Sequence, residues 1–456
     1  MIFNRRRLVG ALAGAASAGS AGPVLGREAP AREVSARASI DGASLGLRPD
    51  SSEDQSKILQ RAIDHATSAR AVLRLAPGAY RAGALTLRPH GAIAGVAGAT
   101  RLVLVAGSPL MSAAASDYIG ISGLIFDGAE MPLQGRQGLI DLAHGRSARI
   151  TDCEIVNAGG NGISLTAIEG EVRGNTVSAS DAAIFSIDAA GLSISGNHIR
   201  SAGNNGILVW RSTPGDDGTL VVDNRIENVT NRSGGSGQYG NAINVFRANN
   251  VIVRGNRISK AAFSAVRGNT ASNFQVLGNT CTGLGEVALY AEFGFEGAVI
   301  ANNIVDGAAM GVSVTNFKQG GRLAVVQGNL IRNVLAQRPA GTNPNDDSGI
   351  GIGVEADTLV TGNVIENVRN TGIAAGSGSY LRDVAISANI VRGADYGITV
   401  SVSPGAGASL IADNLISGAR LGAIVGMAWK KPVTGDLSKA GAANYAQLTI
   451  NNNRVR

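Results

Sequence analysis

The sequence predicts an all-β fold, a parallel β-helix in which about 12 to 13 short coils stack into one solenoid behind a short N-terminal capping helix. A Gly-Asn-x-Ile motif recurs along most of the chain, at spacings such as 22 residues from Asn175 to Asn197 and 23 residues from Asn256 to Asn279. The apolar residues around each motif alternate with small or polar ones, as in strands with one buried face. Glycine is 63 of 456 residues, nearly twice its usual share of about 7%, which suits a fold with many tight corners.

The composition limits the core and the partners of this fold. Hydrophobic residues make up 44% of the chain but aromatic residues only 4%, so we expect thin core layers of Val, Ile, Leu and Ala. The formal net charge is +6, yet charged residues are only 16% and no long Lys/Arg run follows the N-terminus. Phosphate backbones need clustered cations, so we expect no nucleic-acid partner. A basic surface also suits an acidic polysaccharide.

Residues 1–30 are expected to be an export signal and linker. Arg5, Arg6 and Arg7 precede two apolar residues and a weakly apolar run of Ala, Gly and Ser, which resembles a twin-arginine signal. We therefore expect contact with the twin-arginine translocase, cleavage between residues 18 and 31, and a periplasmic or secreted protein; the alternative is a disordered basic start. The run is too short and too rich in glycine to span a membrane stably, so no span is expected in the mature form.

The two cysteines are predicted to be small buried side chains. Cys153 replaces a repeat Asn and Cys281 a repeat Ile, five repeats apart. At about 4.8 Å per stacked strand the separation is roughly 24 Å, beyond the reach of a disulfide.

Residues 31–456 are predicted to form a single β-helix domain, which begins with a cap. Ser52-Glu53-Asp54-Gln55 offers a capping box before the apolar positions of an amphipathic helix, expected at about residues 52–68. Such a helix would protect the first coil from edge-to-edge association. Strands are expected around Val72, Leu85, Ile93 and Val103, regular coils over about 119–456, and residues 429–445 could fold back as a second cap.

The repeated asparagines form a predicted ladder with a structural role. An inward Asn at each corner tolerates a left-handed backbone and can bond to its neighbours above and below. We place the ladder at Leu124, Cys153, Asn175, Asn197, Asn224, Asn256, Asn279, Asn302, Asn329, Asn363, Asn389, Asn414 and Asn453.

The helix followed by Gly-Asn-x-Ile coils resembles the pectin-lyase-like superfamily of right-handed parallel β-helices, over roughly residues 40–456. Together with the paired arginines, the repeats resemble a bacterial family of twin-arginine-translocated repeat proteins. The superfamily resemblance implies action on, or binding of, polysaccharide by lyases, hydrolases and uronate epimerases, with non-enzymatic members as well. The chain has no Asn-Thr-Asp, Gly-His-Gly or Arg-Ile-Lys motif, which argues against polygalacturonase-type hydrolysis. The Asp-Pro-His motif of alginate epimerases is absent as well.

Stacking the Ile-x-Val strands aligns two outward rows on one face. The first row contains Ser164, Phe185, Leu208, Asn244, Arg267, Tyr290, Ser313, Gly351 and Ala374. The second contains Thr166, Ile187, Trp210, Phe246, Asn269, Glu292, Thr315, Gly353 and Gly376. The middle coils therefore carry aromatic, arginine, amide and carboxylate side chains, whereas the outer coils carry mostly small residues.

This cluster suits an acidic sugar polymer, because arginine pairs with a uronate carboxylate and aromatic faces pack on sugar rings. The predicted substrate-binding residues are Trp210, Arg211, Asn244, Phe246, Arg247, Asn269 and Asn316. If the site is catalytic, we expect proton abstraction beside a uronate carboxyl, giving β-elimination or C5 epimerisation. Arg211, Arg247 or Arg267 would neutralise the carboxylate, and Tyr290 or Glu292 would act as base or acid. The predicted catalytic residues are thus Arg267, Tyr290 and Glu292.

Two alternatives stay open at this point. The cluster could be ordinary solvated positions and aromatic packing under the long loops at residues 228–239 and 335–347, and the protein could be a non-catalytic glycan-binding or envelope scaffold protein. No cofactor and no metal-ligand set is predicted, although Asp346-Asp347 or Asp216-Asp217 could hold Ca²⁺. A second row of His198, Arg225 and Arg257 is either a basic binding edge or a solvated face.

Overall fold

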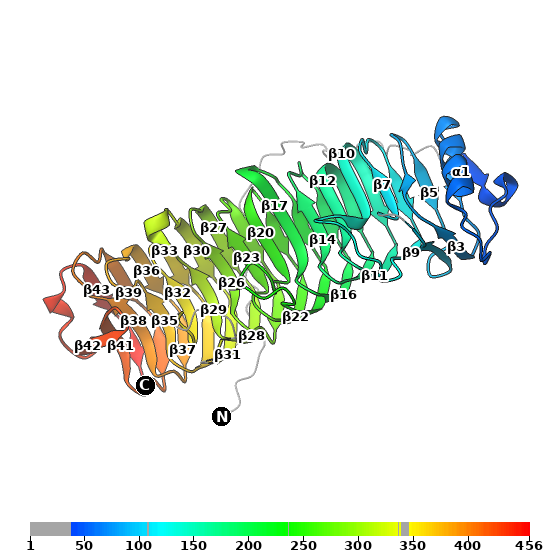
Figure 1. The fold of residues 1–456 in the computed structure, drawn as a ribbon. Helices are drawn as coiled ribbons and strands as arrows, with labels where there is room; N and C mark the ends of the chain where they lie inside the picture. The colour runs from blue at the N-terminus through cyan, green and yellow to red at the C-terminus, as the bar shows by residue number, and fades with distance from the viewer. Residues whose placement is uncertain (1–37, 107–108, 236, 336, 339–345) are drawn as a thin grey trace, which may run out of the picture. The chain divides into compact units, whose positions relative to one another are not determined.

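The computed structural model describes residues 38–106, 109–235, 237–335, 337–338 and 346–456. Residues 38–456 form one compact unit, in which short strands stack coil upon coil from the α1 end to the β43 end (Figure 1). The predicted twin-arginine signal lies outside the described residues. Each coil contributes strands to three faces, and every strand pair between coils is parallel.

The first face carries the predicted site rows. It consists of β4 (Leu85–Thr86), β7 (Met111–Ala113), the first part of β10 (Gly138–Thr151), the first part of β12 (Asn161–Arg173), β14 (Ala182–Ile187), β17 (Asn205–Asp216), β20 (Ile243–Asn249), β23 (Val266–Asn269), β26 (Val287–Glu292), β29 (Met310–Val314), β32 (Ile350–Val354), β35 (Thr371–Ala375), β38 (Tyr396–Ser401) and β41 (Gly422–Ala428).

The second face follows the first after a turn. It consists of β1 (Ser39–Asp41), β2 (Val72–Arg74), β5 (Ala92–Ala94), β8 (Gly120–Ser122), the later parts of β10 and β12, β15 (Ser193–Ser195), β18 (Leu220–Val222), β21 (Ile252–Arg254), β24 (Phe274–Leu277), β27 (Glu296–Ala301), β30 (Arg322–Gln327), β33 (Ala356–Thr361), β36 (Arg382–Ser387), β39 (Ser409–Ala412) and β43 (Leu448–Asn451).

The third face is a separate sheet of 15 strands in the described part of the chain. It consists of β3 (Gly78–Ala82), β6 (Thr100–Leu104), β9 (Ile125–Asp127), β11 (Glu154–Ala158), β13 (Thr176–Ala179), β16 (His198–Ala202), β19 (Arg225–Val229), β22 (Arg257–Ala261), β25 (Thr280–Thr282), β28 (Ile304–Ala308), β31 (Leu330–Val334), β34 (Val364–Val368), β37 (Ile390–Arg392), β40 (Leu415–Ser417) and β44 (Arg454–Val455). Because β3 and β6 precede β9, the stack has more coils than predicted, and it begins well before residue 119.

The core is a continuous aliphatic column inside the three faces. Inward residues at equivalent positions stack directly, as Ile207, Ile243 and Val266 do on the first face, and all three are fully buried. Most of the interior is filled by Val, Ile, Leu and Ala, as the composition predicts, but Tyr80, Phe126, Phe274 and Phe295 are fully buried in it as well. The column fixes the register, because a slip of one residue would turn every outward side chain inward.

The asparagine ladder is present and continuous from Asn175 to Asn453. Each side-chain amide nitrogen donates to the side-chain oxygen of the next Asn at 2.9–3.0 Å. The placement at Asn302 is wrong: Asn303 is the buried rung. Asn302 instead occupies the preceding corner at φ 58°, where the neighbouring coils have Gly278 and Gly328. Asn302 and Asn303 both fitted the sequence pattern, but Asn302 occupies the left-handed corner and Asn303 the ladder position.

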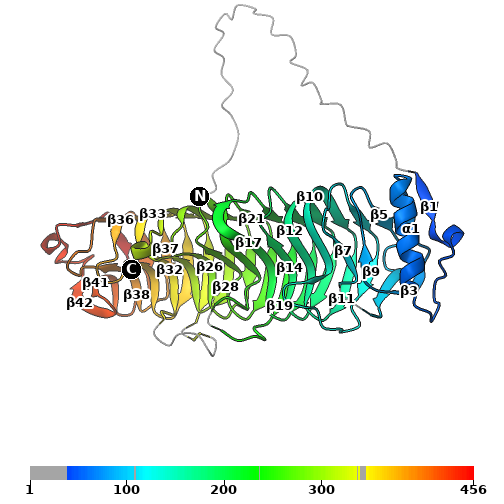
Figure 2. The ribbon, with the colours of Figure 1, turned by 45° about the horizontal axis from the view of Figure 1, so that its top comes forward.

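The predicted capping helix is α1 (Ser56–Ser68), which lies across the end of the stack (Figure 2). Its buried face is Leu59, Ala62, Ile63 and Ala66. The helix starts at Ser56 instead of residue 52, because Gln55 is buried and its side chain bonds both backbone polar groups of Arg48. The Asp54 carboxylate, rather than the Ser52 box, accepts the Ser56 amide at 2.8 Å.

The other end closes with an antiparallel strand, β42 (Lys431–Asp436), paired to β41. Short 3₁₀ turns lie at Gly42–Leu45, Phe317–Gln319 and Ala442–Asn444. Cys153 and Cys281 are both free and buried, as predicted. Across the described segments, no helix has the length and apolar character needed to cross a membrane.

Candidate functional site

The first row of predicted site residues is confirmed up to Ser313. Register pairs run from Ser164 through Asn244, Arg267 and Tyr290 to Ser313. The next residue in the row is Gly353, and not Gly351 as expected. The inward residue of β32 is Ile352, which pairs with Val312 and Ile373.

This correction changes the second row as well. Val354 pairs with Val314, so the next outward residue is Glu355, where the sequence reading placed Gly353. The Glu355 carboxylate accepts a hydrogen bond from the Thr315 hydroxyl at 2.9 Å and from the Phe317 amide at 2.6 Å. The structure therefore adds a carboxylate that the sequence reading missed.

An aromatic cluster occupies the middle of the first face. Trp210 makes edge contacts with Phe185 and Phe246, each at 5.6 Å between ring centroids. The Arg136 guanidinium, from the loop before β10, lies 4.9 Å from the Trp210 ring, and that of Arg247 lies 4.7 Å from Phe246. The three rings are thus in contact and flanked by cations, but Phe185 is only 4% exposed, so Trp210 and Phe246 supply the accessible part of the cluster.

The first site pocket, about 240 Å³, adjoins this cluster. It is lined by Trp210, Gly237, Gln238, Asn244, Phe246, Arg267 and Asn269. Five of these were predicted from the sequence, and the loop after β19 supplies Gly237 and Gln238. One pocket therefore brings together the aromatic, amide and arginine side chains of the prediction.

Arg267 is the most constrained side chain of this pocket. Its Nε donates to Glu292 Oε1 at 2.6 Å and its Nη1 donates to the Gly237 carbonyl at 2.7 Å. Glu286 lies 3.7 Å from Nη1, and Asn269 also donates to Glu292 at 2.9 Å. Burial opposes the charge, but Glu292 and Glu286 more than compensate and raise the pKa of Arg267. The cation is held in place and already paired.

The second site pocket, also about 240 Å³, contains the phenol. Its lining includes Tyr290, Asn316, Arg338, Asp346 and Glu355. The Arg267 guanidinium lies 5.2 Å from the Tyr290 ring centroid. Burial, followed by the Glu292 charge, raises the pKa of Tyr290, so the phenol keeps its proton at neutral pH and can donate it.

Glu286 links the second pocket to the first. Its carboxylate accepts from Arg338 Nη1 at 2.9 Å and lies 3.7 Å from Arg267. It is 3% exposed, and burial raises its pKa. No pattern in the sequence indicates this contact, because Arg338 lies 52 residues from Glu286 and outside the repeated strands.

Arg211 is not brought into either pocket. It donates to the Ala189 carbonyl at 3.1 Å and lies 3.9 Å from the buried Asp217. Arg247 donates to the Ser212 carbonyl at 3.1 Å and reaches the site through its contact with Phe246.

The candidate calcium ligands are engaged elsewhere. Asp347 lies 2.8 Å from Lys430 Nζ, and Asp346 lies 3.7 Å from Arg338. Asp216 accepts from Asn250 at 2.7 Å. Among the residues with described positions, no three His, Cys, Asp or Glu side chains form a potential metal site.

The basic row of the third face is stacked as predicted. His198, Arg225 and Arg257 are register partners. Glu227 lies 2.7 Å from His198 Nε2 and 3.6 Å from Arg225. A carboxylate therefore compensates part of this row, and the row lies on a different face from both pockets.

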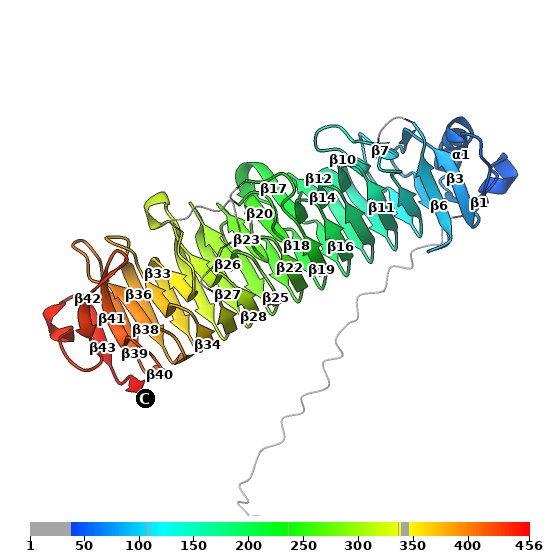
Figure 3. The same cartoon turned by 60° about the horizontal axis from the view of Figure 1, so that its bottom comes forward.

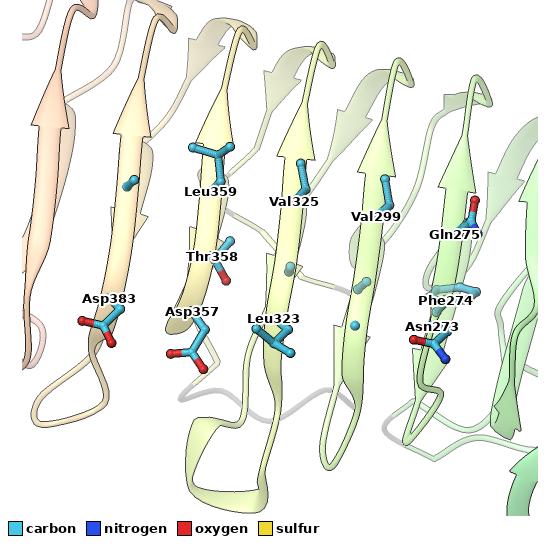
Figure 4. A pocket seen from close by; sticks show the side chains of 14 residues that line it. Asn273, Phe274, Gln275, Val299, Leu323, Val325, Asp357, Thr358, Leu359 and Asp383 are labelled. Atoms are coloured by element: carbon cyan, nitrogen blue, oxygen red, sulfur yellow. The ribbon is translucent and has the colours of Figure 1, made fainter.

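The second-face hollow is a larger cavity, about 570 Å³, over β24, β27, β30, β33 and β36. Its floor is aliphatic, with Val299, Val325 and Leu359 pointing outward in line (Figure 4). Asp357 at its rim accepts from Arg382 and Arg322, which lower its pKa to about 2. The hollow offers apolar surface and a paired surface charge, without a buried titratable cluster in its lining.

Comparisons with known proteins agree with this architecture. The family described as "Right handed beta helix region" matches residues 115–226 and 169–331. The chain has a right-handed parallel β-helix fold, and the match supports a place in that superfamily. A search of curated proteins finds no match.

Several solved structures are similar to the chain at low identity. The pre-mature bacteriophage phi29 gene product 12 is 12% identical with a TM-score of 0.51, covering 85% of this chain and 55% of that one. An exopolygalacturonase from Thermotoga maritima is 12% identical with a TM-score of 0.43 and coverages of 92% and 91%. The A-module of the Azotobacter vinelandii mannuronan C-5 epimerase AlgE6 is 15% identical with a TM-score of 0.42 and coverages of 91% and 99%. At such identities, similarity concerns the fold alone.

Proposed function

We propose that this protein is exported and acts on an acidic polysaccharide bound along the first face. The observation that carries the proposal is the succession of half-buried Trp210 and Phe246, the Arg267 pocket that they line, and the Tyr290 pocket, whose phenol ring lies 5.2 Å from the Arg267 guanidinium. Coils rise about 4.8 Å apart, a spacing comparable with one sugar unit, so successive sugars can meet successive coils.

The chemistry best suited to this path is proton transfer beside a uronate carboxyl. Arg267 and Arg338 supply positive charge at the boundary of the two pockets, and the protonated Tyr290 would donate to the departing glycosidic oxygen. The C5 proton would pass to a carboxylate of the same pocket, Asp346 or Glu355. Loss of the C4–O bond then gives an unsaturated sugar, whereas donation of the Tyr290 proton to C5 from the other side, with the C4–O bond kept, gives the epimer. Glu292 acts as a positioning residue that orients Arg267.

A second candidate is glycan binding without turnover. It is favoured by the pairing of Arg267 with Glu292 and Glu286, which leaves less of its charge for a substrate carboxylate. In that case the aromatic cluster and the pocket amides supply the affinity, and the buried ion pairs shape the surface.

The test is to incubate the purified protein with pectate and with alginate. Ultraviolet absorbance of an unsaturated uronate reports elimination, and proton NMR of the polymer reports epimerisation. We expect Tyr290→Phe to reduce turnover at least about 100-fold with binding retained, and the exposed Tyr118→Phe to match wild type. Saturable binding without product would select the second candidate, and absence of both binding and product would contradict both.

A further inference from the structure

The outward column of the third face changes character along the solenoid. From β11 to β22 it carries Glu154, Thr176, His198, Arg225 and Arg257. From β28 to β40 it carries Ile304, Leu330, Val364, Ile390 and Leu415, in register. Figure 3 shows these strands side by side. Ile304, Leu330 and Val364 are 41%, 39% and 41% exposed, so this half presents an aliphatic row to solvent.

A column of alternating charge runs beside the aliphatic row. It consists of Asp306, Arg332, Glu366 and Arg392, which are register partners in that order. Within the chain, Arg332 lies 2.8 Å from Asp306 and Arg392 lies 3.4 Å from Glu366. The side chains of Arg332, Glu366 and Arg392 remain more than half exposed, so they can meet a second set of partners.

This pattern is self-complementary under one rotation. Consider a two-fold axis in the plane of the face, parallel to the strands and midway between β31 and β34. The rotation reverses the order of the coils, but each column still faces the same column of the second copy. Asp306 then faces the second copy's Arg392, and Arg332 faces its Glu366, while the aliphatic rows cover each other. An axis along the solenoid would keep the coil order and would bring no opposite charges together.

We propose that the third face from β25 to β40 binds a second copy of this chain in an antiparallel, isologous dimer. Complementarity of charge and apolar rows identifies the partner, because reversal pairs every charge of the column with its opposite. Six strands at about 4.8 Å and five residues at about 3.3 Å span roughly 500 Å² per copy, below the usual ~800 Å². The dimer is therefore weak and depends on concentration. Both first-face grooves stay open in it.

Sedimentation velocity of the mature chain over a concentration series tests the proposal. We expect a monomer–dimer equilibrium. Glu366→Arg should raise the dissociation constant at least tenfold, because the substituted arginine of each copy then faces Arg332 of the other. The double variant Arg332→Glu/Glu366→Arg should restore association, since the reversed column is again complementary. If the charged column acted only within each chain, the double variant should not regain association, because it places like charges next to each other in the same column.

Two matched controls locate the interface. Arg257→Glu changes the polar half of the same column, and Leu410→Asp changes an exposed aliphatic residue of the second face, 40% exposed; both should dimerise as wild type does. Leu330→Asp should abolish the dimer, with melting temperature checked for every variant. A wild-type chain that stays monomeric at several hundred micromolar would overturn the proposal. So would an unaffected Glu366→Arg dimer, or failure of a folded double variant to regain association.

Discussion

The first-face pockets and the second-face hollow differ in what surrounds them more than in size. The hollow is larger, at about 570 Å³ against about 240 Å³ for each pocket. Asp357 at its rim is paired with two arginines, and its floor is aliphatic. Arg267 lines one pocket and Tyr290 the other, and the buried Glu292 and Glu286 contact Arg267. Burial or charge shifts the pKa of Arg267, Glu286 and Tyr290. Buried titratable groups in contact are a stronger indication of a functional site than volume is.

The largest expected effect is at Arg267. Arg267→Ala leaves the buried Glu292 and Glu286 carboxylates without their shared cation, and breaking such a pair costs about 3–5 kcal/mol of unfolding free energy. Urea unfolding measures this cost. Arg247→Ala, which removes a half-buried guanidinium bonded to one carbonyl, should cost less than about 1 kcal/mol. Equal costs for the two variants would mean that the Arg267 network is no more coupled than a surface contact.

The ladder common to all coils provides the next prediction. Asn256→Ala removes the acceptor of the Asn224 amide and the donor to the Val221 carbonyl, all inside the core. We expect a loss of about 3 kcal/mol, because buried polar groups are left unpaired. The exposed Arg254→Ala of the same coil serves as the control. A loss below about 1 kcal/mol in urea unfolding would show that the ladder adds little to stability.

The smallest effect concerns the rim of the second-face hollow and depends on pH. Hydrogen bonds from Arg382 and Arg322 lower the folded-state pKa of Asp357 from 3.8 to about 2. Its contribution is therefore present above pH 3.8 and is lost as the pH falls toward 2. Asp357→Asn should be destabilised at pH 7, by on the order of 1 kcal/mol, and the difference from wild type should disappear near pH 2. A difference that persists at pH 2 would show that packing, and not charge, is responsible.

The features that recur in every coil could be predicted from the sequence, whereas contacts made by single loop residues could not. Ile207, Ile243 and Val266 recur with the coil period, so the core, most of the ladder, the first row through Ser313 and the second row through Glu292 followed from the pattern. The register failed at β32, because Ile350 and Ile352 both fit the apolar position and only stacking on Val312 selects the second. Arg136 and Arg338 were missed because they lie between strands, where no periodicity indicates which first-face residues they contact. Glu286 was missed because its partners are distant in sequence.

The central claim is that the first face, and not the larger hollow, is where a glycan binds. Hydrogen exchange of the mature protein, with and without saturating oligogalacturonate or oligomannuronate, tests it directly. We predict slowed exchange in β20, β23 and the loop that carries Gly237 and Gln238, with no change in β27, β30 and β33. Protection confined to β27, β30 and β33 would contradict the account and would place the binding surface at the second-face hollow.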